Sequence, residues 1–188
     1  MQMKNMRAQG AYLGLLLLAC TTGVQAADNT TVTVSSNVTE GSCKVSVPAA
    51  QAFSRGHAGS EFTGVQRTAE TMLLNITVEN CQGSIPGKKP AILVTGTPLA
   101  GQADIFADAS STAKNVGVAV REGVYSGPLS GFYVTGSMVS NTKPETYVDN
   151  IDTVSGGVYP YTLGMVSDGA TPGLGQVKAT LTFAFKYQ

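Results

Sequence analysis

The sequence contains a single histidine, His57, within the polar stretch SRGHAGSE. A catalytic histidine needs a carboxylate that orients it and a nucleophile within hydrogen-bond reach. Ser54, Ser60 and Glu61 lie near it in the sequence, and we interpret them as solvated residues of a loop. One histidine beside paired cysteines gives no metal-ligand cluster, and no glycine-rich phosphate motif leads from a strand into a helix. We therefore expect no catalytic residue, no metal and no cofactor.

The first residues have the pattern of an export signal. Lys4 and Arg7 form a positive n-region, and residues 11–20 (AYLGLLLLAC) form an uninterrupted apolar run. Small residues at the −3 and −1 positions predict cleavage between Ala26 and Ala27. The apolar run is shorter than the roughly 20 residues that a membrane-spanning helix needs. We therefore expect an exported protein.

An alternative cleavage site lies at Cys20. Residues 17–20 (LLAC) resemble a lipobox, and cleavage there would leave Cys20 acylated and the protein anchored to a membrane. Such motifs usually have a smaller residue in the place of Leu18. Because the site at Ala26 is also a conventional one, we favour cleavage after Ala26.

Two cysteines, Cys43 and Cys81, remain once the signal is removed. An even pair of cysteines in an oxidising compartment predicts a disulfide. Closing a loop of about 38 residues would stabilise the fold by roughly 4 kcal/mol in the chain-entropy model. We therefore expect a structural bridge.

The composition of the expected mature chain narrows the classes of protein. Its 162 residues suit one domain. Removing Lys4 and Arg7 from the 12 basic residues leaves 10 against 12 acidic ones, a net charge near −2. There is no basic stripe, so we expect no nucleic-acid partner. The 22 glycines and the low charged fraction of 13% favour a β-protein with many tight turns.

Apolar and polar residues alternate along several short stretches, which is typical of half-buried strands. The stretches are residues 45–47, 72–78, 116–120 and 159–165, together with the apolar run 91–95. Pro160 indicates an edge strand or the start of a strand. The sequence of residues 101–114 predicts a polar loop with a short helical turn. The connections are rich in Gly, Pro, Asn, Ser and Asp, and the pattern predicts an all-β sandwich.

The last segment, from Val177 to Tyr187, has the clearest alternation in the chain. Its apolar face consists of Val177, Ala179, Leu181, Phe183, Phe185 and Tyr187, and the residues between them are mostly polar. Burying that face would contribute on the order of 10 kcal/mol as an upper value. We expect one face of this strand to lie against the core.

The segment from Thr30 to Val47 is longer than a usual strand of about 5–6 residues. Its only internal break is Glu40-Gly41-Ser42. Residues 30–38 either fold back at Gly41 as a hairpin or project as an extended arm. A free arm with alternating apolar side chains is an aggregation hazard unless another sheet accepts it. The residues alone leave both alternatives open.

Several motifs of the sequence resemble those of type 1-like pilin subunits of the chaperone–usher pathway. The C-terminus, GQVKATLTFAFKYQ, has Gly175 at the fourteenth position from the end and Tyr187 at the penultimate one. The stretches NITVENC, KNVGVAVREG and ATPG are similar to strand and turn motifs of that family. The expected mature N-terminus, ADNTTVTVSSNVTEGSC, is similar to the family's N-terminal extensions.

The resemblance implies an incomplete immunoglobulin-like β-sandwich that lacks its seventh strand and is completed by donor-strand exchange. Chaperone–pilin complementation is an established case of β-augmentation, in which an extended segment is added to a sheet edge. The implied partners are a periplasmic pilus chaperone, an outer-membrane usher and neighbouring pilin subunits in a homo- or heteropolymer. The implied organisation is a signal peptide (1–26), a donor-strand extension (27–40) and a pilin domain (41–188). The expected destination is a cell-surface fimbrium that supports adhesion.

The resemblance also assigns residues to these roles. The donor strand would point Thr30, Val32, Val34, Ser36 and Val38 into the neighbouring subunit. The acceptor groove and the chaperone contact would involve Gly175, Val177, Leu181, Phe183, Phe185, Tyr187 and the terminal carboxylate of Gln188. Ser36 departs from the family pattern, which usually has Gly at one inward position.

Four alternatives remain beside this interpretation. The C-terminal alternation also suits an ordinary core strand of a complete sandwich, and the N-terminal segment also suits a disordered tail. A carbohydrate-binding tip adhesin or adaptor would bind a host glycan or receptor, and its sugar-stacking patch could use Tyr125, Phe132, Tyr133 and Tyr147. We consider core packing the better role for those rings. A secreted hydrolase would have to depend on His57.

Overall fold

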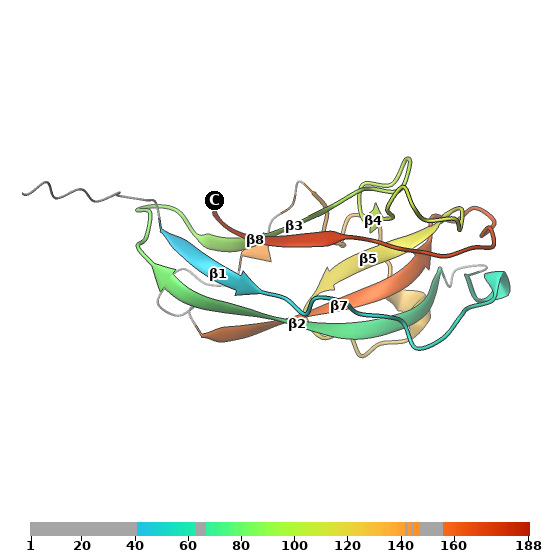
Figure 1. Ribbon diagram of the computed structural model, residues 1–188, viewed down its shortest axis with the longest axis horizontal. Helices are drawn as coiled ribbons and strands as arrows, with labels where there is room; N and C mark the ends of the chain where they lie inside the picture. The colour runs from blue at the N-terminus through green and yellow to red at the C-terminus, as the bar shows by residue number, and fades with distance from the viewer. Residues whose placement is uncertain (1–40, 63–66, 142, 144, 147–155) are drawn as a thin grey trace, which may run out of the picture. The chain divides into compact units, whose positions relative to one another are not determined.

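Two β-sheets face each other in the computed structural model of the chain (Figure 1). The structure describes residues 41–62, 67–141, 143, 145–146 and 156–188. The expected signal peptide, its cleavage site and the donor-strand extension (27–40) lie outside the described residues, as does Tyr147.

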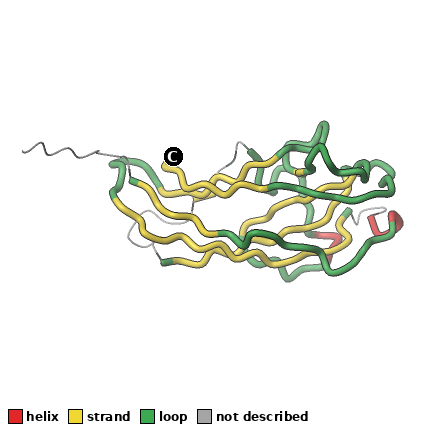
Figure 2. Tube along the Cα trace, viewed as in Figure 1, coloured by secondary structure: helices red, strands yellow, loops and turns green. Residues whose placement is uncertain are grey.

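Antiparallel strands dominate the described residues. The strands are β1 (Ser42–Ser46), β2 (Thr68–Gln82), β3 (Pro90–Gly96), β4 (Ile105–Phe106), β5 (Val116–Glu122), β6 (Glu145–Thr146), β7 (Gly157–Ser167) and β8 (Leu181–Tyr187). The 3₁₀ helices η1 (Gly59–Phe62) and η2 (Leu129–Gly131) are the only helical turns in this part of the chain (Figure 2). One sheet has the order β1-β2-β7-β5-β4 and the other β6-β3-β8. The predicted all-β sandwich is confirmed.

The main core lies between the two sheets. Alternate residues of each strand point into it, as a period of two requires. The larger sheet contributes Leu74, Ile76, Val78, Val118, Val120, Tyr161 and Leu163, and the smaller one contributes Ile92 and Val94. The predicted inward faces of β2, β5 and β7 are therefore confirmed. Phe183 of β8 completes an edge-to-face pair with Tyr161 at 5.3 Å between ring centroids.

A second cluster covers the outer face of the larger sheet. Phe132, Tyr133 and Met138 pack there, together with Ile105 of β4 and other buried residues. Gly164 of β7 makes this possible, since a Cβ at that position would overlap the ring of Phe132. Phe132 and Tyr133 are buried, so their rings are not available to stack on a sugar.

Two local predictions from the sequence need correction. Of the two positions expected for Pro160, the edge strand is wrong, because β7 lies between β2 and β5, whereas Pro160 does lie near the start of β7, which begins at Gly157. Pro160 is tolerated there because β5 ends at Glu122, and the carbonyl of Pro160 accepts the N–H of Gly123 beyond that end. The expected loop over residues 101–114 contains the buried strand β4, which pairs with β5, instead of a helical turn.

The predicted disulfide is confirmed: Cys43 of β1 is bonded to Cys81 of β2, with an S–S distance of 2.10 Å. It joins the first described strand to the strand beside it in the sheet. Among the described residues, no helix is both long and apolar enough to cross a bilayer.

Candidate functional site

A groove of about 780 Å³ opens along one edge of the sandwich. We call it the edge groove. Its walls are residues 47–57, which follow β1, and residues 172–183, which lead into β8. Its floor is apolar and comes from the inner face of the larger sheet, with Met72, Leu74 and Leu163 among the floor residues. The site is therefore a channel with an apolar floor between two stretches of chain.

Residues 176–187 form one alternating segment that contains most of the first wall. Its odd-numbered side chains point inward but stay half-buried, while its even-numbered side chains are exposed. The backbone of Gln188 exchanges two hydrogen bonds with Lys89, so the even-numbered residues of β8 direct their backbone groups toward β3. The odd-numbered residues 177–185 direct theirs toward the groove. In the described part of the chain no strand pairs with that side of β8.

The stretch before β8 is held on the same side as β3. The N–H of Asp108 donates to Lys178 O at 2.7 Å, and the N–H of Thr112 donates to Gln176 O at 2.9 Å. The N–H and the hydroxyl of Thr180 both donate to the Asp108 carboxylate. The backbone hydrogen bond from Thr180 is the main cause that holds the pKa of Asp108 below its usual value. This wall is thus fixed by a ladder on one side and open on the other.

The second wall, residues 47–57, is held differently. It belongs to no strand, and most of its residues are exposed, with Phe53 and His57 as the inward exceptions. Within the described part of the chain, its recorded backbone hydrogen bonds are the N–H of Ser54 to Glu70 Oε1 and Arg55 Nη1 to Gly56 O. Phe53 packs against the main core. Within the residues that the structure describes, the backbone of this wall therefore pairs with no strand.

The two walls run in opposite directions. Gly41 lies against the hydroxyl of Tyr187 at one end, and Gly59 lies near Pro172 at the other. Tyr187 closes its end by donating a hydrogen bond to Gly83 O at 3.0 Å. The groove is therefore bounded at both ends as well as along both sides.

The residues assigned to the acceptor groove by resemblance fall into two places. Gly175, Val177, Leu181 and Phe183 line the edge groove. Phe185 and Tyr187 line a smaller hollow beyond its end, together with Gly41 and Cys43. Gln188 lies past the strand and pairs with Lys89 through its backbone.

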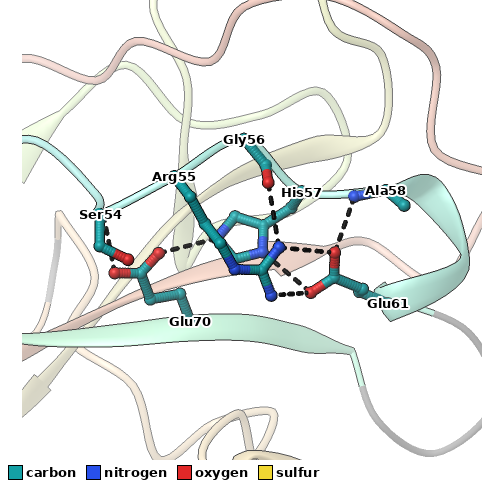
Figure 3. A network of polar contacts seen from close by, with 7 residues as sticks. All are labelled: Ser54, Arg55, Gly56, His57, Ala58, Glu61 and Glu70. Atoms are coloured by element: carbon teal, nitrogen blue, oxygen red, sulfur yellow. Dashed lines mark hydrogen bonds and ion pairs between the residues drawn. The ribbon is translucent and has the colours of Figure 1, made fainter.

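A charged network anchors the second wall (Figure 3). His57 Nδ1 is 3.0 Å from Glu61 Oε2, and its Nε2 is 2.7 Å from Glu70 Oε2. Arg55 donates to both carboxylate oxygens of Glu61, at 3.1 and 2.6 Å. The side chain of His57 is only 2% exposed, and its ring meets Phe62 edge-on. The network connects the wall, η1 and β2.

Because of this network, our interpretation of Glu61 as a solvated loop residue was wrong. Glu61 binds Arg55, His57 and the N–H of Ala58, and the side-chain hydrogen bond from Arg55 is the largest cause of its pKa lying well below the usual value. Burial raises the pKa of Glu70, but the Ser54 N–H and the His57 ring outweigh it, so that the pKa lies below its usual value.

Only part of this network could have been predicted from the sequence. Glu61 follows His57 by four residues, whereas Glu70 reaches it only through the fold. No nucleophile completes a triad with His57 among the described hydrogen bonds. Within the described ranges, no group of three or more His, Cys, Asp or Glu residues could hold a metal ion.

Comparisons with known proteins give structural likenesses only. No protein-family model matches the sequence, and no curated protein matches it. The P pilus rod subunit PapA is similar in structure, with 18% identity and a TM-score of 0.49 over 84% of this chain and 100% of that chain. The P pilus adaptor subunit PapF has 14% identity and a TM-score of 0.41, over 81% and 100%.

A third solved structure is the Burkholderia pseudomallei antigen and type I fimbria protein BPSL1626. It has 18% identity and a TM-score of 0.49, and the match covers 78% of this chain and 95% of that chain.

Proposed function

We propose that the chain is a structural subunit of a surface fimbria, and that it polymerises by accepting a β-strand of a neighbouring molecule into the edge groove. The observation that carries this proposal is a groove with an apolar floor, flanked by residues 177–185 and residues 47–57, whose groove-facing backbone pairs with no strand among the described residues. An inserted strand would find hydrogen-bond partners on both sides.

The energetics favour an occupant over an empty groove. The inward side chains of the C-terminal segment are half-buried, whereas Leu74, Ile76 and Leu163 on the facing strands are buried. Covering them gains hydrophobic free energy at about 25 cal/mol per Å². An open apolar edge of this kind also promotes aggregation. Both effects are relieved by β-augmentation, in which backbone bonds give affinity and side-chain pockets give register.

The chain's own N-terminal extension fits the groove in length and pattern. The open edge spans nine residues, 177–185, and the predicted donor strand Thr30–Val38 also spans nine. Thr30, Val32, Val34, Ser36 and Val38 would enter the pockets. In the cell, a chaperone strand would fill the groove in the periplasm, and the extension of the next subunit would replace it at the outer-membrane usher. The finished fimbrium would support adhesion at the cell surface.

A complementation assay tests the proposal. A chain that lacks residues 27–39 is purified and mixed with a synthetic peptide of residues 27–40. At a peptide concentration of 100 times its Kd, binding stabilises the protein by about 2.7 kcal/mol. This corresponds to a rise of roughly 5–10 °C in Tm for a domain of this size.

The control peptide carries Val32→Asp and Val34→Asp, which put charges at two inward positions. It should leave the Tm unchanged. If the native peptide also leaves the Tm unchanged, and the truncated chain is already as stable as a complete sandwich, the proposal is wrong.

A further inference from the structure

The 47–57 wall is held by side chains because it has no backbone ladder. Phe53 contacts the core, and the N–H of Ser54 reaches Glu70 at 2.8 Å. Two further attachments come from Arg55, which binds Glu61 of η1, and from His57, which contacts both Glu61 and Glu70 of β2. His57 therefore fixes the far end of this wall to two separate elements.

The geometry at His57 has a consequence for its protonation. Ionised carboxylates only accept hydrogen bonds, and a neutral imidazole has one donor and one acceptor nitrogen. Two carboxylate oxygens at 3.0 and 2.7 Å therefore require both ring nitrogens to carry a proton. The carboxyl groups are ionised at neutral pH, since hydrogen bonds hold the pKa of each below its usual value.

The charges around His57 balance in this state. The charged groups that face it in the described residues are Glu61, Glu70 and, through Glu61, Arg55. A charged imidazole beside one arginine and two glutamates makes a neutral cluster. A neutral imidazole would turn a lone pair toward one carboxylate and lose that contact.

We infer that His57 is a positioning residue for the edge groove: clamped between Glu61 and Glu70, it holds the 47–57 wall at the spacing that an inserted strand needs. This inference rests on the proposed function. Loss of one ring proton would break one of the two carboxylate contacts, so the wall is fixed while the ring is charged and loosens when it becomes neutral. Strand acceptance by the groove therefore weakens as the pH rises.

Two properties of the chain make this testable without an unknown ligand. His57 is the only histidine, so its ring signals in an NMR titration are unambiguous in the exported chain prepared without a histidine tag. Hydrogen exchange reports directly on the amides of residues 47–57. The probe for strand acceptance is the synthetic peptide of residues 27–40.

The test compares the exported chain, as its monomeric fraction, with His57→Gln and Glu70→Gln. The control is Glu79→Gln, which removes a charge from the same strand at an exposed position beside Lys44. For the two test variants we expect amide exchange in the 47–57 wall to rise about tenfold and peptide affinity to fall about tenfold, as for the loss of one charged hydrogen bond. Core amides and the control variant should be unchanged.

The pH profile separates positioning from a merely structural role. In the parent chain, peptide affinity should fall across the same pH interval in which the His57 ring titrates, and in His57→Gln it should be flat. If His57→Gln binds the peptide as tightly as the parent and protects the 47–57 amides equally, the inference is wrong while the proposed function stands. If the parent binds no peptide, the proposed function fails, and the exchange data still decide whether His57 holds the wall.

Discussion

Replacing Cys43 and Cys81 together by alanine removes a covalent link across a sequence separation of 38 residues. In the chain-entropy model this link stabilises the fold by about 4 kcal/mol, because it restricts the unfolded chain. Both cysteines are only partly buried, so the lost packing of their sulfur atoms is a minor addition. The expected loss of unfolding free energy is therefore about 4 kcal/mol.

Equilibrium unfolding in urea measures this loss. The midpoint should fall, and the m-value should rise because the unfolded chain becomes less compact. In a thermal scan, each kcal/mol corresponds to about 2–4 °C for a domain of this size, so the Tm should fall by roughly 8–16 °C. Reducing the parent chain with a thiol should reproduce the effect of the double substitution.

A small effect would refute the reasoning. If the double variant unfolds within about 1 kcal/mol of the parent, the unfolded chain is already restricted and the entropy argument does not apply. If reduction and substitution give different losses, the packing of the two side chains accounts for the difference.

Three further predictions concern other parts of the structure. Gly164→Ala should lower the unfolding free energy by about 1–3 kcal/mol, since the new methyl group overlaps the ring of Phe132, and Phe132→Leu should partly rescue it in a double-mutant cycle. Tyr133→Phe should cost about 1–3 kcal/mol in urea unfolding, because it removes the hydrogen bond of 2.8 Å to Asp104 in a buried site. The folded pKa of Glu61 is depressed, so its contribution to stability is present above the unfolded pKa of about 4.3 and is lost as the pH falls. Glu61→Gln should therefore lose less stability than the parent between about pH 5 and about pH 3, and equal slopes would contradict the network.

The regular strands could be predicted from the sequence because their period-2 pattern reflects which face is buried. The alternation over residues 177–187 gave the inward face of β8 correctly. The pattern could not tell what covers that face. Its side chains are half-buried because no strand of the described residues pairs with β8 on the side opposite β3. The value of about 10 kcal/mol for burying this face is therefore not reached in the chain alone.

The second wall shows why the other parts of the site could not be predicted from the sequence. Pro48 ends the β1 pattern in the sequence, and β1 ends at Ser46 in the structure. After it, the small residues Ala49 and Ala50 offer no periodicity from which a groove wall could be read. His57 looked like a loop residue because the position of Glu70 opposite it depends on the path of the whole chain. Burial of a polar cluster is a tertiary property.

The opposite directions of the two groove walls limit what can be inserted between them. Any strand in the groove must be parallel to one wall and antiparallel to the other, whichever way it enters (Figure 1). Reversing the direction of the inserted strand changes which wall it is parallel to, so one parallel and one antiparallel ladder remain. Since parallel and antiparallel ladders differ only slightly in strength per residue, the backbone alone selects neither orientation. The direction of an inserted strand would therefore depend on how its side chains fit the groove.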